Sequence, residues 1–204
     1  LFPYTTLFRS VPVRIAELWL EAGLPEWIFQ VVHGDKEMVD LILDHPAIGA
    51  VSFVGSSDIA HYVYNRGVAA GKRVQAMGGA KNHGIVMPDA DLDQVVGDLC
   101  GAAFGSAGER CMAISVVVAV EPVADKLIPK IVERMGKLRT GDGRRGCDMG
   151  PLVTREHRDK VASYIDIAEK DGATVVVDGR NPQVDGDANG FWLAPTLVDK
   201  VPTT

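Results

Sequence analysis

The sequence predicts an α/β fold, in which short buried strands are joined by crossover helices and therefore run parallel. Two observations support this prediction. From residue 11 onward, segments with apolar residues at helical spacing alternate with strand-length apolar runs. The β-α-β-α-β order between residues 29 and 77 is typical of parallel sheets, which bind ligands at the carboxyl ends of their strands.

The composition is that of an ordinary globular protein, and it argues against several functional classes. The 204 residues are 47% hydrophobic and 24% charged, and a net charge of −6 argues against nucleic acid or an anionic membrane as partner. No apolar run approaches the roughly 20 residues of a membrane-spanning helix. Three cysteines without paired spacing argue against disulfides and favour a reducing, cytoplasmic location. The five histidines are scattered singly, so no metal site is predicted.

The first ten residues, LFPYTTLFRS, stand apart from the rest of the chain. They lack the charged region and the long apolar core of a secretory signal. They also resemble one translated reading frame of a widely used DNA-sequencing adapter. We therefore expect Leu1–Ser10 to be an assembly artefact and the natural protein to continue further upstream.

Residues 11–78 are expected to form a leading helix followed by alternating strands and helices. Ile15 and Leu18 lie at helical spacing in the leading helix, and Gly23 ends it. Short apolar runs such as AVSFV predict the strands. The predicted elements are a helix over 13–22, a strand over 29–32, a helix over 36–44, a strand over 50–54, a helix over 59–70 and a strand over 73–77.

A second α/β unit is expected over residues 79–204, because the glycine pair Gly78-Gly79 is typical of a hinge or domain boundary. Pro129 is expected to kink one helix or to mark its true start, and Pro195 predicts an edge strand. The predicted elements are strands over 84–87, 113–120, 174–178 and 191–198, and helices over 92–103, 123–138 and 154–171.

The stretch Phe104–Cys111, FGSAGERC, connects a predicted helix to a predicted strand and is the leading candidate for chemistry. Glycines allow the backbone to approach a ligand closely, and a thiol there can act as a thiolate nucleophile. The alternative is an inert structural cysteine, which is the commoner case. Cys100 is expected in the core, and Cys147 is expected to be exposed without a neighbouring base.

The stretch Gly55-Ser56-Ser57 joins a predicted strand to a predicted helix, an arrangement that suits a phosphate. The alternative is that Ser56 or Ser57 only caps the helix, and without a full GxGxxG fingerprint the stretch alone favours capping. A basic cluster at residues 137–145 is either an anion site or, more commonly, a solvated loop.

Three alternating aspartates at residues 89–93 resemble the start of a calcium loop. Gln94 and Cys100 stand where such a loop needs glycine and glutamate, so calcium is rejected. These aspartates are expected to start the next helix instead.

In their order, these motifs resemble the aldehyde dehydrogenase superfamily, and in particular its CoA-acylating methylmalonate-semialdehyde dehydrogenase branch. The resemblance runs from about Val11 to Thr204. The matching motifs are SFVGSS at 52–57, RVQAMGGAKNH at 73–83, MPDADLD at 87–93, FGSAGERCMA at 104–113, GPLVT at 150–154 and APTL at 194–197. Such an ordered set is far more specific than any one motif.

The resemblance implies an aldehyde-dehydrogenase-like α/β fold. A partial Rossmann-type NAD-binding domain is expected over residues 11–78, and a partial α/β catalytic domain over residues 79–204. The family's oxyanion asparagine and its ribose-binding lysine are expected upstream of the chain, and its ribose-binding glutamate beyond Thr204. A homotetramer is implied for the complete protein.

The resemblance also implies roles for particular residues. Cys111 corresponds to the catalytic nucleophile, Ser56 with Gly55 lies against the NAD pyrophosphate, and Gly78 lies near the nicotinamide. The implied cofactor is NAD, and CoA is the implied co-substrate. The implied reaction converts methylmalonate or malonate semialdehyde to propionyl-CoA or acetyl-CoA through a thioester on Cys111.

Met77 is the informative difference from hydrolytic members of the superfamily. Those enzymes carry a glutamate at this position, which activates the water that releases the acyl group. Methionine cannot accept a proton, whereas a thiol such as CoA depends less on a local base. Met77 therefore favours thiolysis. The alternatives are a hydrolytic aldehyde dehydrogenase with a substituted base, and an inactive folding unit.

Overall fold

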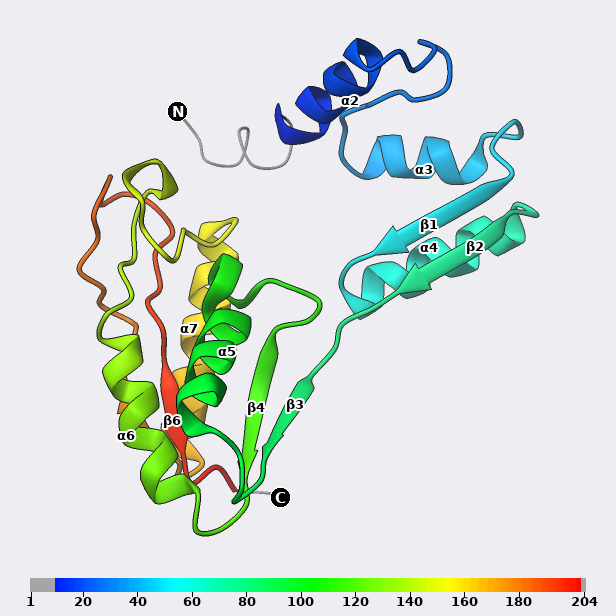
Figure 1. Cartoon of the computed structure of the whole chain (residues 1–204). Coiled ribbons are helices and arrows are strands. Elements are labelled where there is room, and N and C mark those ends of the chain that lie inside the picture. Colours follow the sequence, from blue (N-terminus) through cyan, green and yellow to red (C-terminus); the bar gives the residue numbers. More distant parts are fainter. Residues whose placement is uncertain (1–9, 203–204) are drawn as a thin grey trace. The chain divides into compact units, whose positions relative to one another are not determined.

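The computed structural model describes residues 10–202 and divides them into two compact units, with the division between Gly79 and Ala80 (Figure 1). The predicted artefact lies outside the described residues except for Ser10. None of the helices between residues 10 and 202 is long and apolar enough to span a membrane.

The N-terminal unit contains a parallel pair of strands joined by one crossover helix (Figure 1). Its strands pair in register from Ala50 opposite Arg73 to Val54 opposite Met77, so both carboxyl ends reach the same edge. The parallel arrangement predicted from the sequence is confirmed here. The elements are α2 (Val11–Glu21), α3 (Lys36–Asp44), β1 (Ala50–Val54), α4 (Ser57–Ala69) and β2 (Arg73–Met77).

Helices α3 and α4 are joined by a small apolar core and by charged side chains. Leu43 and Val63 are each 1% exposed, and they contribute most to this core. At the surface, the guanidinium of Arg66 binds Asp44 at 2.6 Å and lowers the pKa of that carboxyl. These contacts hold α4 beside α3 and so fix the helix that begins at Ser57.

The predicted strand over 29–32 is wrong, since this segment has no regular secondary structure. Val32 is 58% exposed, and within the described residues no strand pairs with this run. An apolar run becomes a strand only where a neighbour completes its backbone hydrogen bonds.

The C-terminal unit contains a parallel pair, β3 with β4, and an antiparallel pair, β5 with β6. Helix α5 is the crossover between the parallel strands. The elements are β3 (Asn82–Val86), α5 (Leu92–Phe104), η2 (Gly105–Gly108), β4 (Ile114–Ala119), α6 (Ala124–Met135), η3 (Gly143–Arg145), α7 (Arg155–Lys170), β5 (Thr174–Val177) and β6 (Leu197–Asp199).

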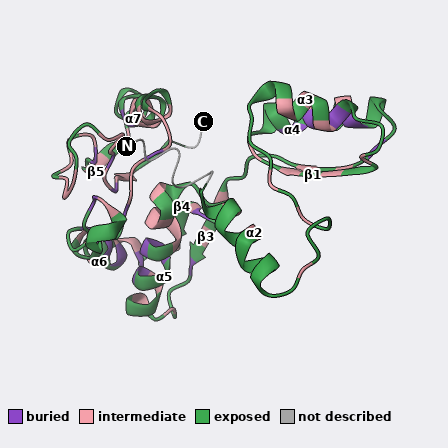
Figure 2. Cartoon of the chain, turned by 90° about the horizontal axis from the view of Figure 1, so that it is seen from above, coloured by how far each residue is buried: buried purple, intermediate pink, exposed green. Residues whose placement is uncertain are grey.

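The main core of this unit lies where α5 packs against α6 (Figure 2). Leu99 from α5 and Leu127 from α6 are buried there, together with Val86 at the end of β3. Cys100 is 4% exposed in the same cluster, which confirms it as a core residue. The prediction that the aspartates at residues 89–93 start the next helix is also confirmed, because the carboxylate of Asp91 accepts the N–H groups of Asp93 and Gln94 and caps α5.

Two predictions about prolines need correction. Pro129 does not mark the start of its helix, since α6 begins at Ala124 and continues through it to Met135. The predicted strand over 191–198 is limited to β6, which starts two residues after Pro195. Proline lacks the N–H that a strand ladder needs, and pairing with β5 begins only beyond it.

Candidate functional site

Cys111 lies at the corner of a tight turn between η2 and β4. The N–H of Ala113 donates to the Arg110 carbonyl at 3.0 Å, and this bond closes the turn around Cys111 and Met112. The thiol is exposed, as is Met112 at 77%. The Cys111 N–H donates no hydrogen bond within the described residues, so it is available to an incoming oxygen. The turn therefore presents both a thiol and a free backbone donor.

The backbone leading to this turn is left-handed over three successive residues. Ser106 and Ala107 both have φ of 54°, and Gly108 has φ of 74°. Side chains with a Cβ rarely adopt this conformation, which costs of order 1–3 kcal/mol per residue and persists only where the surroundings hold it. Two contacts from distant parts of the sequence supply that support.

The first contact comes from Asn82, at the start of β3. Its side-chain amide donates to the carbonyl oxygens of Cys111 and Ala113, both at 2.9 Å. The second comes from α7, where Nε2 of His157 lies 2.9 Å from the carboxylate of Glu109. The Glu109 side chain is only 26% exposed, and its burial raises its pKa, with His157 acting in the opposite sense. The loop is thus held from both sides.

The N-terminal unit brings the other predicted site residues together at the carboxyl edge of β1 and β2. The N–H of Gly55 donates to the Met77 carbonyl at 3.1 Å, and the N–H of Gly79 donates to Ser57 Oγ at 3.1 Å. Gly78 packs so closely on α4 that a Cβ there would lie 2.9 Å from Ser57 Oγ. This places Gly55, Gly78 and the half-exposed Met77 side by side at the start of α4.

Ser56 is the N-cap residue of α4, yet its side chain makes no capping hydrogen bond. In contrast, the side chains of Asp35, Asp91 and Thr154 each accept a backbone N–H at the start of their helices. The sequence-based preference for capping is therefore wrong for Ser56, although Ser57 does bind backbone as an acceptor for Gly79. The Ser56 hydroxyl and the first N–H groups of α4 suit an anionic group such as a pyrophosphate.

The basic cluster is not an open anion site, because its cations are already paired with carboxylates. The pairs are Lys137 with Glu133, Arg139 and Arg145 with Asp185, and Arg144 with Asp142. The solvated-loop interpretation is therefore the better one. Cys147 is half-buried beside Arg139 and Asp185, rather than exposed as predicted, since the loop folds back over its sulfur.

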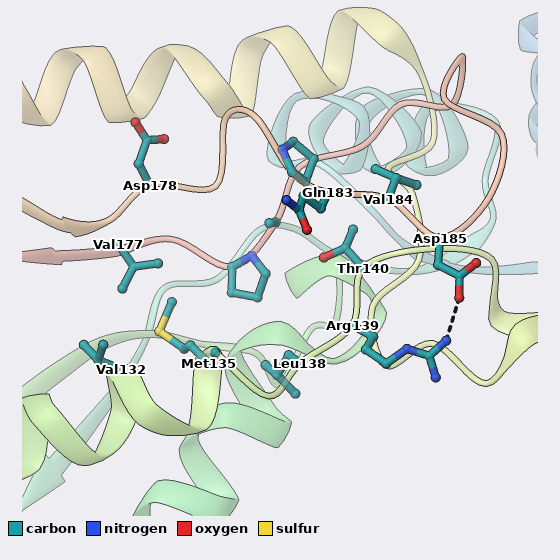
Figure 3. A pocket seen from close by; sticks show the side chains of 14 residues that line it. Val132, Met135, Leu138, Arg139, Thr140, Val177, Asp178, Gln183, Val184 and Asp185 are labelled. Atoms are coloured by element: carbon teal, nitrogen blue, oxygen red, sulfur yellow. Dashed lines mark hydrogen bonds and ion pairs between the residues drawn. The ribbon is translucent and has the colours of Figure 1, made fainter.

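A cavity of about 600 Å³ lies beside the end of α6 in the C-terminal unit (Figure 3). Apolar side chains such as Val132 and Met135 line one part, and the Arg139–Asp185 ion pair lines another. Cys111 is not among its lining residues. The candidate chemistry thus lies on the exposed turn rather than in this cavity.

Sequence reasoning proposed Cys111, Gly55, Ser56 and Gly78 as site residues, but it did not predict the contacts that hold them. Ser57 and Asn82 lie in motifs noted in the sequence, whereas His157 does not. The bonds that these three residues make with Gly79, Cys111 and Glu109 follow from the tertiary structure. Glu109 lies inside the FGSAGERC stretch, where a carboxylate two residues from the thiol was the available signal.

Comparisons with known proteins agree with the resemblance. The model of the aldehyde dehydrogenase family matches residues 6–204. Malonate-semialdehyde dehydrogenase of Pseudomonas aeruginosa is 57% identical over 194 residues, which cover 94% of this chain and 39% of that protein. The crystal structure of methylmalonate-semialdehyde dehydrogenase from Oceanimonas doudoroffii is 54% identical with a TM-score of 0.87, covering 93% of this chain and 39% of that one.

A candidate methylmalonate-semialdehyde dehydrogenase from Sinorhizobium meliloti, solved in complex with NAD, is 54% identical with a TM-score of 0.88. That match covers 95% of this chain and 40% of the other. The chain therefore spans about two fifths of the length of the relatives it matches.

Proposed function

The chain belongs to the aldehyde dehydrogenase family, and on that premise we propose that it is part of an NAD-dependent, CoA-acylating semialdehyde dehydrogenase. The observation that carries the acylating assignment is Met77 at the carboxyl end of β2. Hydrolytic members of the superfamily need a base at that position, and a thioether cannot accept a proton. The names of the similar proteins support malonate or methylmalonate semialdehyde as the substrate.

The residues of the N-terminal edge fit the cofactor. The uncapped start of α4 offers N–H groups and the Ser56 hydroxyl to a pyrophosphate, and the close packing of Gly78 on Ser57 keeps that edge flat. When bound, NAD supplies the acceptor for a hydride. Gly55, Ser56 and Gly78 are the residues that we assign to holding it.

Cys111 carries the covalent chemistry in this proposal. Its thiolate adds to the aldehyde carbon, and the resulting oxyanion accepts a hydrogen bond from the free Cys111 N–H. Loss of hydride from that carbon leaves a thioester on Cys111. The β-carboxylate then leaves as carbon dioxide and the carbon takes up a proton. CoA thiolate attacks the thioester, forms acetyl-CoA or propionyl-CoA, and releases the Cys111 thiolate.

The test is NADH formation by the complete reading frame that contains this chain, with malonate and methylmalonate semialdehyde, in the presence and absence of CoA. We expect sustained turnover only with CoA, and an acyl-CoA product identified by mass spectrometry. The variant Cys111→Ser is expected to form no NADH under either condition. Equal turnover without CoA would sink the acylating assignment and favour a hydrolytic enzyme.

A further inference from the structure

The side chain of Asn82 makes hydrogen bonds at the start of the β3–β4 pairing, where the chain leaves the Cys111 turn. Asn82 lies opposite Ile114, but the next residue, His83, lies opposite Val116, so the regular register is interrupted there. The carbonyls of Cys111 and Ala113 precede β4 and have no strand partner in this ladder. The Asn82 amide donates to both of them at 2.9 Å.

This double contact fixes the geometry of the residue that carries the thiol. The bond to the Cys111 carbonyl orients the peptide plane between Cys111 and Met112, and the bond to Ala113 fixes the far side of the same turn. The turn is closed internally by the Ala113 N–H and the Arg110 carbonyl. Without the amide, an exposed turn that follows three left-handed residues would keep that one internal bond.

We propose that Asn82 is a positioning residue for the Cys111 nucleophile, acting through the two carbonyls rather than by touching substrate. The proposal rests on the proposed function of Cys111 and deepens it. The amide is neutral, and its nitrogen donates both bonds, so its contribution does not depend on its own ionisation. A carboxylate of the same shape would instead turn an oxygen toward two carbonyl oxygens.

The first arm of the test uses the 204-residue chain and the alkylation of its three cysteines by iodoacetamide, resolved by peptide mass spectrometry. Cys147 in the same unit is the internal reference, and the buried Cys100 reports on folding. In Asn82→Asp and Asn82→Ala, the Cys111 to Cys147 rate ratio is expected to change while Cys100 stays protected. The control Ser115→Ala, on an exposed position of β4, is expected to keep the wild-type ratio.

The second arm measures kcat and KM in the complete reading frame. A displacement of about 1 Å costs about 10²-fold in rate, so kcat is expected to fall about 10- to 10²-fold in Asn82→Asp, with KM for NAD unchanged. Asn82→Ser keeps one donor and is expected to retain an intermediate kcat. If Cys100 becomes reactive in Asn82→Asp, that variant is misfolded and Asn82→Ser decides the question. An intermediate kcat in Asn82→Ser supports the proposal, and a wild-type kcat overturns it.

A wild-type alkylation ratio and wild-type kcat in folded Asn82 variants would show that the contact is only structural. Failure of the wild-type enzyme to form NADH would instead refute the proposed function. The alkylation arm does not depend on that activity, so the two failures are distinguishable.

Discussion

Gly78→Ala adds one methyl group where β2 leads away from the start of α4. The new Cβ would lie 2.9 Å from Ser57 Oγ, 3.1 Å from Ser57 Cα and 3.3 Å from Ser57 Cβ. The serine hydroxyl can rotate, but the backbone Cα cannot move without shifting the first turn of α4. We therefore expect this substitution to push α4 away from the strand end.

The expected change in the free energy of unfolding for Gly78→Ala follows from two opposing effects. Overpacking of this kind costs about 1–3 kcal/mol. Replacing glycine by alanine also restricts the unfolded chain, which offsets about 0.4–1 kcal/mol. The net destabilisation is thus about 0–2.6 kcal/mol. For a unit of the size of the N-terminal one, which ends at Gly79, each kcal/mol lowers the unfolding midpoint by about 4–8 °C.

The assays are thermal unfolding and hydrogen exchange of the peptide that contains the first turn of α4. Gly49→Ala is the matched control, because a Cβ at Gly49 has nothing within 4 Å. Gly78→Ala is expected to unfold earlier, to exchange faster over Ser57, and to bind NAD more weakly in the complete protein. If both variants are equally stable and exchange alike, the close approach at Gly78 has no energetic role.

Four further predictions concern single side chains. Met77→Glu supplies a base, so it is expected to raise NADH turnover without CoA; no increase would count against this role for the position. Burial raises the pKa of Glu109 above its ordinary 4.5, so the folded chain binds that proton more tightly and loses stability as pH rises through the folded pKa. Glu109→Gln is expected to flatten the fall in the free energy of unfolding above pH 4.5, measured by urea unfolding, and an unchanged slope would contradict it. Asp91→Ala removes a helix cap and is expected to cost about 0.5–2 kcal/mol in the same assay, whereas Ser56→Ala removes no capping bond and is expected to weaken NAD binding with little loss of stability.

The local pattern predicted the elements best where a boundary residue is chemically distinctive. Helix α3 has the predicted bounds because Asp35 caps its start and His45-Pro46 ends it. The run over 29–32 failed because the pattern reports apolar character and not the presence of a neighbouring strand. The strand predicted before Pro195 failed for a related reason, because proline has no backbone N–H to donate to a strand ladder.

In the candidate site, too, some residues could be predicted from local motifs, whereas the contacts that hold them could not. Cys111 was proposed as the nucleophile from its own motif, and Met77 was singled out from its place in a second motif. The hydrogen bond that Asn82 donates to the Cys111 carbonyl could not be predicted from a motif. Asn82 lies 29 residues earlier in the chain, and the pairing of β3 with β4 is what brings the two residues together. Ser56 was misjudged because propensity describes the average serine before a helix, whereas here the neighbouring Ser57 makes the polar contact.

The order of the chemical steps separates the roles of Asn82 and Met77. In the proposed reaction, addition of the Cys111 thiolate and loss of hydride both precede release of the acyl group, so a residue that positions the thiolate would act on the first NADH formed. A base introduced at position 77 would act only afterwards in that reaction, on the water that attacks the thioester. In rapid-mixing experiments, Asn82→Asp is therefore expected to slow the first-turnover rise of NADH, while Met77→Glu leaves that rise unchanged and alters the later phase without CoA. A slower first turnover in Met77→Glu would mean that the methionine also shapes the acylation step, and the assignment of thiolysis to its missing proton acceptor alone would no longer hold.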